Sequence, residues 1–186
     1  MNLKNVDATL DVITGPMFAG KSEELIRRIK ILTIAKNKVL IVKPSFDTRF
    51  GIEKITSRNG NFIEAIPTDK SSEILGFIKP DTDVVAIDEV HFFDDNIVKV
   101  IEQILKLNIS VIVSGLDMDF LNRPFGVMPN ILAIADSVSK LKAVCMVCHK
   151  LAGYSFRKVS SNDLNLLGDD EYEARCRKCH WAGLTK

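Results

Sequence analysis

The chain has 186 residues, of which 46% are apolar, so it is long enough and apolar enough to fold around its own core. It carries 25 basic and 24 acidic residues, which gives a formal net charge of +1. Because nucleic-acid-binding surfaces usually show a basic excess or stripe, this balance argues against a nucleic-acid partner.

The N-terminal residues 1–7 contain no apolar run of signal-peptide length, and no stretch of the chain approaches the length of a membrane span. We therefore expect a cytoplasmic protein without a membrane partner. Thiols stay reduced in that compartment, which bears on the cysteines near the C-terminus.

Short apolar runs alternate with segments of helical apolar spacing over most of the sequence. The first run, at residues 10–14, stops at a Gly-Pro pair. A helix is expected to follow from about residue 22 to 36, because its apolar side chains fall on one face. Further strands are expected at residues 39–42, 83–87 and 109–113, and a further helix at residues 94–107.

This alternation of β-branched strands and amphipathic helices predicts an α/β fold, with a parallel sheet flanked by helices on both faces. In such sheets ligands bind at the carboxyl ends of the strands. Three polar clusters follow predicted strands, at residues 15–22, 88–93 and 115–125. We expect these clusters to form one site.

Residues 15–22 match the phosphate-binding pattern G-x-x-x-x-G-K-[ST] between a strand and a helix, which indicates a sheet of the P-loop NTPase type. Lys21 would reach the β- and γ-phosphates of ATP, and the Ser22 hydroxyl would bind Mg²⁺. The alternative is a glycine-containing turn that binds nothing. The residues expected to bind ATP and Mg²⁺ here are Gly15, Pro16, Met17, Phe18, Ala19, Gly20, Lys21 and Ser22.

Asp88 and Glu89 follow an apolar run, where P-loop proteins hold Mg²⁺ through a carboxylate. Glu89 is then free to accept a proton, from an attacking hydroxyl in a kinase or from water in an ATPase. Both carboxylates could instead be solvated and idle. His91 could contact substrate or nucleotide, although a lone histidine is more often structural. Phe92 and Phe93 could flank a base or belong to the core.

The four cysteines of the chain form two C-x-x-C pairs. In a reduced compartment two such pairs predict a tetrahedral zinc site better than two disulfides. The site would be structural, since four thiolates leave no open position for catalysis. The pairs are Cys145 with Cys148 and Cys176 with Cys179.

The neighbours His149 and His180 are alternative zinc ligands, and four unrelated buried thiols are the alternative to a metal site. Apolar periodicity fades after about residue 141, where the cysteines begin. We therefore expect a P-loop domain at residues 1–140 and a small zinc-binding module, similar to a zinc ribbon, at residues 141–186.

Further motifs occur in a fixed order along the chain. They are Glu24-Leu25-Ile26-Arg27-Arg28, Lys43-Pro44, Asp47-Thr48-Arg49, Asp88-Glu89 with Phe92-Phe93, Gly115-Leu116-Asp117 with Phe120, Pro124-Phe125-Gly126 and Tyr172-Glu173-Ala174-Arg175-Cys176-Arg177. Together with the phosphate loop, these motifs resemble the cytosolic, zinc-containing type of thymidine kinase over about residues 9–180.

The resemblance implies ATP-dependent phosphorylation of thymidine, and of deoxyuridine, at the 5′-hydroxyl for nucleotide salvage and DNA synthesis. It implies that Glu89 is the base for that hydroxyl, with Asp88 and Ser22 serving Mg²⁺. Family members commonly form homotetramers and are inhibited by thymidine triphosphate, and we expect both here. The additional positions implied for binding ATP and Mg²⁺ are Asp47, Thr48, Arg49, Val90 and His91.

The resemblance also implies a thymine pocket and a lasso loop, anchored at both ends by zinc, that closes over the base and excludes water. Phe120 would offer a stacking face for the base and Tyr172 would contact the sugar. Ordinary packing is the alternative role for these side chains. The expected substrate-binding residues are Met17, Phe92, Leu116, Phe120, Phe125, Ser155, Leu164, Asn165, Leu166, Leu167, Gly168 and Tyr172.

The chain departs from the family pattern at a few positions. His91 stands where Gln is common, Arg58 replaces a frequent His, and the lasso is short by about one residue after Gly168. Two other functions remain open at this point. One is a P-loop ATPase or GTPase whose zinc module recruits a protein or nucleic acid, and the other is a relative that binds without catalysis.

Overall fold

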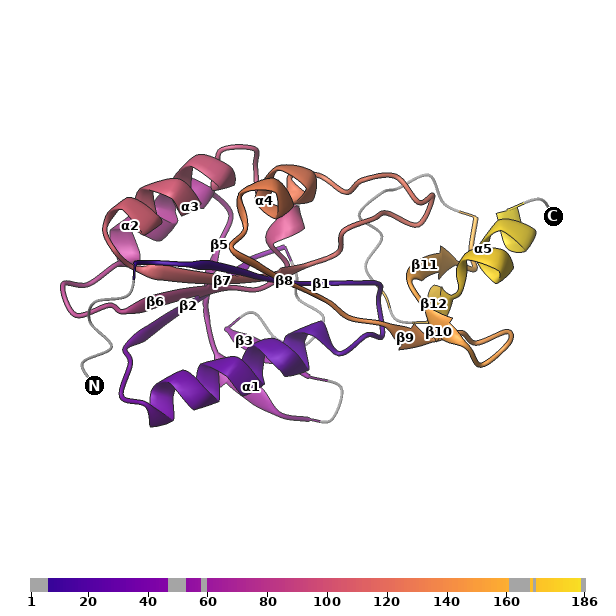
Figure 1. Cartoon of the computed structure of the whole chain (residues 1–186), viewed down its shortest axis with the longest axis horizontal. Helices are drawn as coiled ribbons and strands as arrows, with labels where there is room; N and C mark the ends of the chain where they lie inside the picture. Colours follow the sequence, from indigo (N-terminus) through magenta and orange to yellow (C-terminus); the bar gives the residue numbers. More distant parts are fainter. Residues whose placement is uncertain (1–6, 47–52, 58–59, 161–167, 169, 185–186) are drawn as a thin grey trace.

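The central element of the computed structural model, which describes residues 7–46, 53–57, 60–160, 168 and 170–184, is a six-stranded sheet (Figure 1). All neighbouring strands run parallel, in the order β5-β2-β6-β7-β1-β8. The predicted α/β fold with a parallel sheet is therefore confirmed. The strands are β1 (Leu10–Thr14), β2 (Val39–Pro44), β5 (Ile66–Thr68), β6 (Val84–Ile87), β7 (Ser110–Gly115) and β8 (Ser137–Lys140).

Helices cover both faces of this sheet, because its central strands are apolar on both sides. Every residue of β6 is buried, and alternate side chains of β6 and β7 enter two separate cores. One face packs against α1 (Lys21–Ile34) and the hairpin of β3 (Lys54–Thr56) and β4 (Phe62–Glu64) (Figure 1). The other face carries α2 (Ile74–Phe77), α3 (Ile97–Lys106) and α4 (Met128–Ile134), with short 3₁₀ turns at Ser71–Glu73 and Val90–Phe92.

Two helices differ from the predicted boundaries. Helix α1 ends at Ile34, before the predicted end, because Lys36 adopts a left-handed φ of 67°. Helix α3 begins at Ile97, later than predicted, because the Asp94 carboxylate accepts the backbone N–H of Asn96 at 3.0 Å and forms a turn there.

Neither of the edge strands, β5 and β8, was predicted from the sequence. Strand β8 is mostly exposed, and its polar sequence Ser-Val-Ser-Lys lacks the apolar run that marks the central strands. Its pairing with β1 instead depends on the parallel register from Asp11 opposite Ser137 to Thr14 opposite Lys140. A polar edge strand of this kind also limits pairing with other chains.

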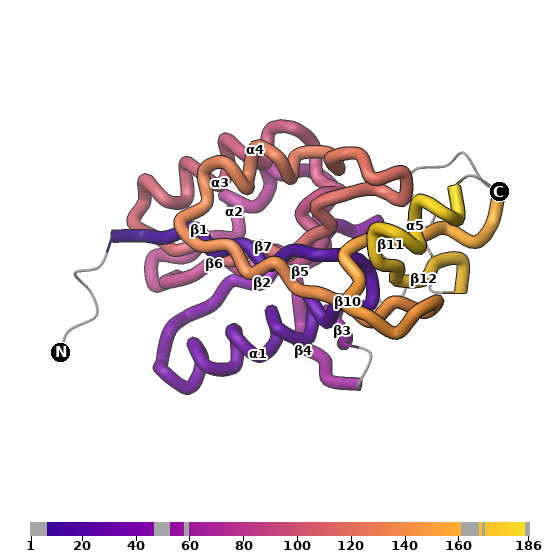
Figure 2. The backbone as a smooth tube through the Cα atoms, turned by 45° about the vertical axis from the view of Figure 1, so that its right-hand side comes forward, coloured from indigo at the N-terminus to yellow at the C-terminus, as the bar shows by residue number. Residues whose placement is uncertain are grey.

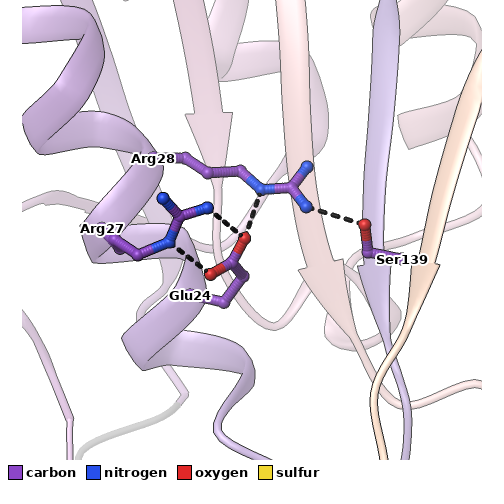
Figure 3. A network of polar contacts seen from close by, with 4 residues as sticks. All are labelled: Glu24, Arg27, Arg28 and Ser139. Carbon is purple, nitrogen blue, oxygen red and sulfur yellow. Dashed lines mark hydrogen bonds and ion pairs between the residues drawn. The ribbon is translucent and has the colours of Figure 1, made fainter.

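Side chains of α1 hold this edge strand (Figure 3). Arg28 Nη2 donates to Ser139 Oγ at 2.7 Å, and Arg28 Nε donates to Glu24 at 2.8 Å. Glu24 also accepts two hydrogen bonds from Arg27, at 2.7 and 2.8 Å. The hydrogen bonds from Arg27, and then those from Arg28, lower the pKa of Glu24 to about 2.

The C-terminal segment forms two small antiparallel sheets and a helix, at the end of the molecule that the strands of the main sheet point toward (Figures 1 and 2). Part of the lasso predicted between the two cysteine pairs, residues 161–167 and 169, falls outside the described residues. Among the described residues, every helix is too short or too polar to cross a lipid bilayer. The C-terminal elements are β9 (Ala143–Val144), β10 (Leu151–Ala152), β11 (Tyr154–Arg157), β12 (Tyr172–Arg175) and α5 (Arg177–Leu184).

Candidate active site

The predicted phosphate loop connects the carboxyl end of β1 to the first turn of α1. Gly15 has a φ of 134°, and a Cβ atom there would lie 2.5 Å from the Leu141 carbonyl oxygen, so only glycine fits. Gly20 precedes the helix in a left-handed conformation. The backbone N–H groups of the first helical turn are therefore available at the positive end of the α1 dipole, an arrangement suited to phosphate.

Lys21 folds back over this loop. Its ammonium Nζ donates to the carbonyl oxygen of Pro16 at 2.9 Å, and the side chain is buried. Phe18 and Ala19 of this loop pack against the C-terminal cluster that contains Cys145. The loop is thus supported by α1 on one side and by the cysteine-bearing segment on the other.

Asp88 and Glu89 lie directly after β6, beside the end of β7. Asp88 is buried, and its Oδ1 accepts a hydrogen bond from the Ser114 hydroxyl. Glu89 has a left-handed φ of 48°, a backbone conformation that costs a non-glycine residue roughly 1–3 kcal/mol. Such strain is concentrated at functional sites, and the Glu89 side chain is partly exposed here.

His91 packs inside the site. Its Nδ1 accepts the backbone N–H of Leu116 at 3.2 Å and lies 3.6 Å from Oε2 of Glu89. The close packing requires Gly115, because a Cβ atom there would lie 3.1 Å from the same nitrogen. The Val90 side chain is fully buried in the core, so only its backbone could face a nucleotide.

Aromatic rings surround His91. Its ring centroid lies 4.1 Å from that of Phe92 and 4.8 Å from that of Phe125. Phe92 and Phe125 meet edge to face at 6.2 Å, and Phe46 contacts Phe92 in the same way at 5.5 Å. Phe93, by contrast, is buried in the core, which was one of its two expected roles.

The loop after β7 also meets the C-terminal segment. The guanidinium carbon of Arg157 lies 3.7 Å from the centre of the Phe120 ring, and Arg157 Nε donates to the Tyr172 hydroxyl at 3.0 Å. Met17 N–H donates to Ser155 Oγ at 3.0 Å. Four predicted pocket residues from distant parts of the sequence therefore form two connected pairs. Met17 contacts Ser155 directly, and Phe120 is connected to Tyr172 through Arg157.

Several predicted site residues lie outside the described residues, so the structure gives no account of them. Gly168 is described, but its predicted neighbours in the lasso are not. The residues concerned are Asp47, Thr48, Arg49, Leu164, Asn165, Leu166 and Leu167, and Arg58, the departure from the family pattern, lies outside the described residues as well.

The four cysteine sulfurs form one cluster, in which all Sγ atoms lie within 4.8 Å of one another. Burial alone would raise the pKa of Cys145, but backbone N–H groups from Cys176, Cys148 and Val147 lower it to about 6. The pKa of Cys179 is raised to about 12, first by its hydrogen bond with Cys176. Such a set cannot ionise completely without a cation, and four thiolates at this spacing fit Zn²⁺.

Neither of the two histidines next to the cysteines in sequence belongs to the sulfur cluster among the described residues. His149 is exposed and is absent from the group of potential metal ligands among the described residues. His180 is fully buried, and burial lowers the pKa of its imidazole below the usual value. Both of its ring nitrogens contact atoms of Phe120, Asn122 and Ser155 rather than the sulfurs.

Comparison with known proteins identifies the family. The thymidine kinase family model matches residues 8–180. This chain belongs to the thymidine kinase family. Thymidine kinase of Mycoplasma mobile is 50% identical over 184 residues, 98% of this chain and 92% of the relative. Thymidine kinase of Mesomycoplasma hyopneumoniae strain 7448 is 51% identical over 97% of this chain and 99% of the relative, and that of Metamycoplasma arthritidis is 48% identical over 95% and 92%.

This membership confirms the thymidine kinase resemblance stated from the motifs. The buried polar residues that were not predicted as site residues nevertheless include Ser114, Arg157 and His180, which contact predicted site residues. The sequence singled out His180 only as a possible metal ligand beside Cys179. It gave no indication that Ser114 or Arg157 belongs to the site, because a polar residue in a strand usually faces solvent and only the contacts in the folded protein show otherwise.

Proposed function

We propose that this protein transfers the γ-phosphoryl group of ATP to the 5′-hydroxyl of thymidine. Membership of the thymidine kinase family supports the nucleoside and the reaction. The phosphate loop at the start of α1 supports ATP as the donor. The observation that carries the proposal is that the phosphate loop, the Asp88–Glu89 pair and the loop from Leu116 follow β1, β6 and β7 at the same edge of the sheet.

In this proposal Glu89 is the catalytic base. Its carboxylate accepts the proton of the 5′-hydroxyl while that oxygen attacks the γ-phosphorus and the bond to the β-phosphate oxygen breaks, so that ADP leaves. The strained backbone and partial exposure of Glu89 support this role. Lys21 exchanges the Pro16 carbonyl for phosphate oxygens when the nucleotide binds.

Asp88 and Ser22 would hold Mg²⁺ between them and the nucleotide. When bound, Mg²⁺ neutralises charge on the β- and γ-phosphates. The Ser114 hydroxyl supports this role, because it donates to Oδ1 of Asp88 and so fixes the orientation of the carboxylate. The loop residues Gly15, Pro16, Met17, Phe18, Ala19 and Gly20, together with Asp47, Thr48, Arg49, Val90 and His91, complete the proposed nucleotide site.

The thymine pocket is proposed to lie between the loop after β7 and strand β11. One face of Phe120 is covered by Arg157, so the base would meet the opposite face or the edge of that ring. Deoxyuridine lacks only the 5-methyl group and is proposed as a second, weaker substrate. The proposed pocket residues are Met17, Phe92, Leu116, Phe120, Phe125, Ser155, Leu164, Asn165, Leu166, Leu167, Gly168 and Tyr172.

We also propose that the cysteine cluster holds a structural Zn²⁺, which fits its four sulfurs and its backbone N–H groups. The arrangement of the four cysteines as one metal-ligand cluster, rather than as two disulfides, supports a cytoplasmic location. We propose further that residues 1–140 form a kinase domain and residues 141–186 a zinc module. The protein is also proposed to form a homotetramer and to be inhibited by thymidine triphosphate.

A substrate panel tests the function. The purified protein is incubated with Mg²⁺, one nucleoside triphosphate and one deoxynucleoside at a time, and the 5′-monophosphate is measured. We expect thymidine monophosphate with ATP, and slower formation of deoxyuridine monophosphate. Phosphorylation of a different nucleoside would refute the pocket assignment, and ATP hydrolysis without transfer to any nucleoside would refute the kinase assignment.

A further inference from the structure

His180 connects the helix that carries Cys179 to two segments outside that helix. Its Nε2 lies 3.0 Å from the carbonyl oxygen of Phe120 and 3.3 Å from that of Ser155. Its Nδ1 lies 3.1 Å from Nδ2 of Asn122. The ring is fully buried, so these contacts are shielded from water.

The contacts define the protonation of the ring. Carbonyl oxygens only accept hydrogen bonds, so Nε2 carries the proton and donates to both of them. The Asn122 amide nitrogen only donates, so Nδ1 must be its unprotonated acceptor. One neutral tautomer of His180 therefore satisfies all three contacts, and neither nitrogen is left to bind a metal.

We propose that His180 is a positioning residue for the nucleoside, which acts by fixing the backbone at Phe120 and Ser155. The inference rests on the proposed function, in which both of these residues line the thymine pocket. Ser155 also accepts the Met17 N–H, so the position of this strand is fixed relative to the phosphate loop as well. Phe120 is thus held at its carbonyl by His180 and at its ring by Arg157.

This arrangement gives the metal-bearing helix a direct role in substrate affinity. Cys179 and His180 are adjacent in α5, so a displaced helix end would displace the Phe120 carbonyl. ATP is bound in the proposal by the loop before α1 and does not contact Phe120. Loss of the His180 hydrogen bonds should therefore weaken thymidine binding more than ATP binding or the chemical step.

The test compares His180→Phe, which keeps an aromatic ring without hydrogen bonds, with His180→Gln, whose amide can still donate. We expect His180→Phe to raise the KM for thymidine about tenfold, the effect of losing a buried hydrogen bond, with the KM for ATP unchanged. His180→Gln should recover part of the affinity. Lys178→Ala, at an exposed position of the same helix, is the control and should match the wild type.

A purely structural role would give a different result. Equal losses for thymidine and ATP, together with loss of bound zinc measured by metal analysis, would overturn the proposal, as would an unchanged thymidine KM in folded His180→Phe. If that variant does not fold, Asn122→Gly decides. Asn122 already has a left-handed φ of 65°, which glycine adopts freely, so this variant removes the side chain with its amide without straining the backbone. A thymidine KM raised about threefold is expected, and no change would contradict the inference.

Hydrogen exchange separates this inference from the proposed function. In His180→Phe, or in Asn122→Gly if the former does not fold, we expect faster exchange in peptides covering residues 116–123 and 154–157, with no change in α3. This readout needs no enzymatic activity. Unchanged exchange would refute the role of His180 even in an active kinase, whereas a wild type that phosphorylates no nucleoside would refute the proposed function alone.

Discussion

The guanidinium of Arg157 lies over the ring of Phe120, with 3.7 Å between its central carbon and the ring centre. Arg157 is buried, and its Nε also donates to the Tyr172 hydroxyl at 3.0 Å. One cation therefore contacts two residues that are proposed to touch the base and the sugar. Because the contact is buried and the guanidinium is a planar group, both the charge and the shape of the side chain matter.

Replacement of Arg157 by Lys should raise the KM for thymidine about tenfold, because the ammonium keeps the charge but loses the planar stacking and the hydrogen-bond geometry. Steady-state kinetics with thymidine and ATP varied in turn measure this effect. Tyr172→Phe is the matched variant, since it removes only the hydroxyl partner. The double variant should then be less than additive, whereas full additivity would show that the two residues act independently.

Replacement of Ser114 by Ala should raise the Mg²⁺ concentration needed for half-maximal activity roughly three- to tenfold, since Asp88 loses the hydrogen bond that orients it. Thr14→Val is the control, because it also removes a buried hydroxyl, which bonds to the Gly115 carbonyl at 2.9 Å instead. Both variants should lose stability. An equal Mg²⁺ requirement in the two variants would contradict the role of Ser114.

The central fold could be predicted because its signal is local. Strands such as Val84–Ile87 are apolar along their whole length, and helix α3 shows regular apolar spacing. Strand β8 could not be predicted, since its polar residues lack an apolar pattern and its place depends on the parallel register with β1, which is distant in sequence. The helix ends were misjudged where one side chain or one left-handed residue decided them, as at Asp94 and Lys36.

The candidate site, like the fold, could be predicted only where its signal is local. The phosphate loop, the Asp88–Glu89 pair and the cysteine pairs are contiguous or closely spaced motifs, and each was visible in the sequence. Residues that support them make contacts between distant positions, such as His180 with Phe120, which are separated by 60 positions. Sequence patterns carry no sign of such contacts, because the polar partner is often a backbone carbonyl.

The Glu24 carboxylate should make stability depend on pH in the acid range. Its pKa is lowered to about 2, so its contribution is complete above the usual value near 4.5 and is lost as pH falls toward 2. Glu24→Gln should therefore cost about 1 kcal/mol at neutral pH, a value reduced by solvent screening of the partly exposed pair with Arg27. Urea unfolding at several pH values and salt concentrations measures the difference. A difference that persists at pH 2 would contradict this assignment.

Removal of the metal should affect the nucleoside more than the nucleotide. A chelator strong enough to extract zinc should disorder strands β9 to β12 and helix α5, because four thiols without a cation no longer hold the two C-x-x-C turns together. Calorimetric titration should then show a larger loss of affinity for thymidine than for ATP, since the phosphate loop is also held by α1. Added zinc should restore the affinity, and unchanged thymidine binding in metal-free protein would show that the cluster is not needed for the pocket.

The most direct test of the proposed reaction is the rate of phosphoryl transfer in Glu89→Gln, measured in single turnovers with saturating Mg-ATP and thymidine. Gln keeps the size of the side chain but cannot take the proton. We predict a fall in rate of about 10²- to 10⁴-fold, with thymidine affinity retained. A rate within about threefold of the wild type would contradict the assignment of Glu89 as the base and with it the proposed mechanism.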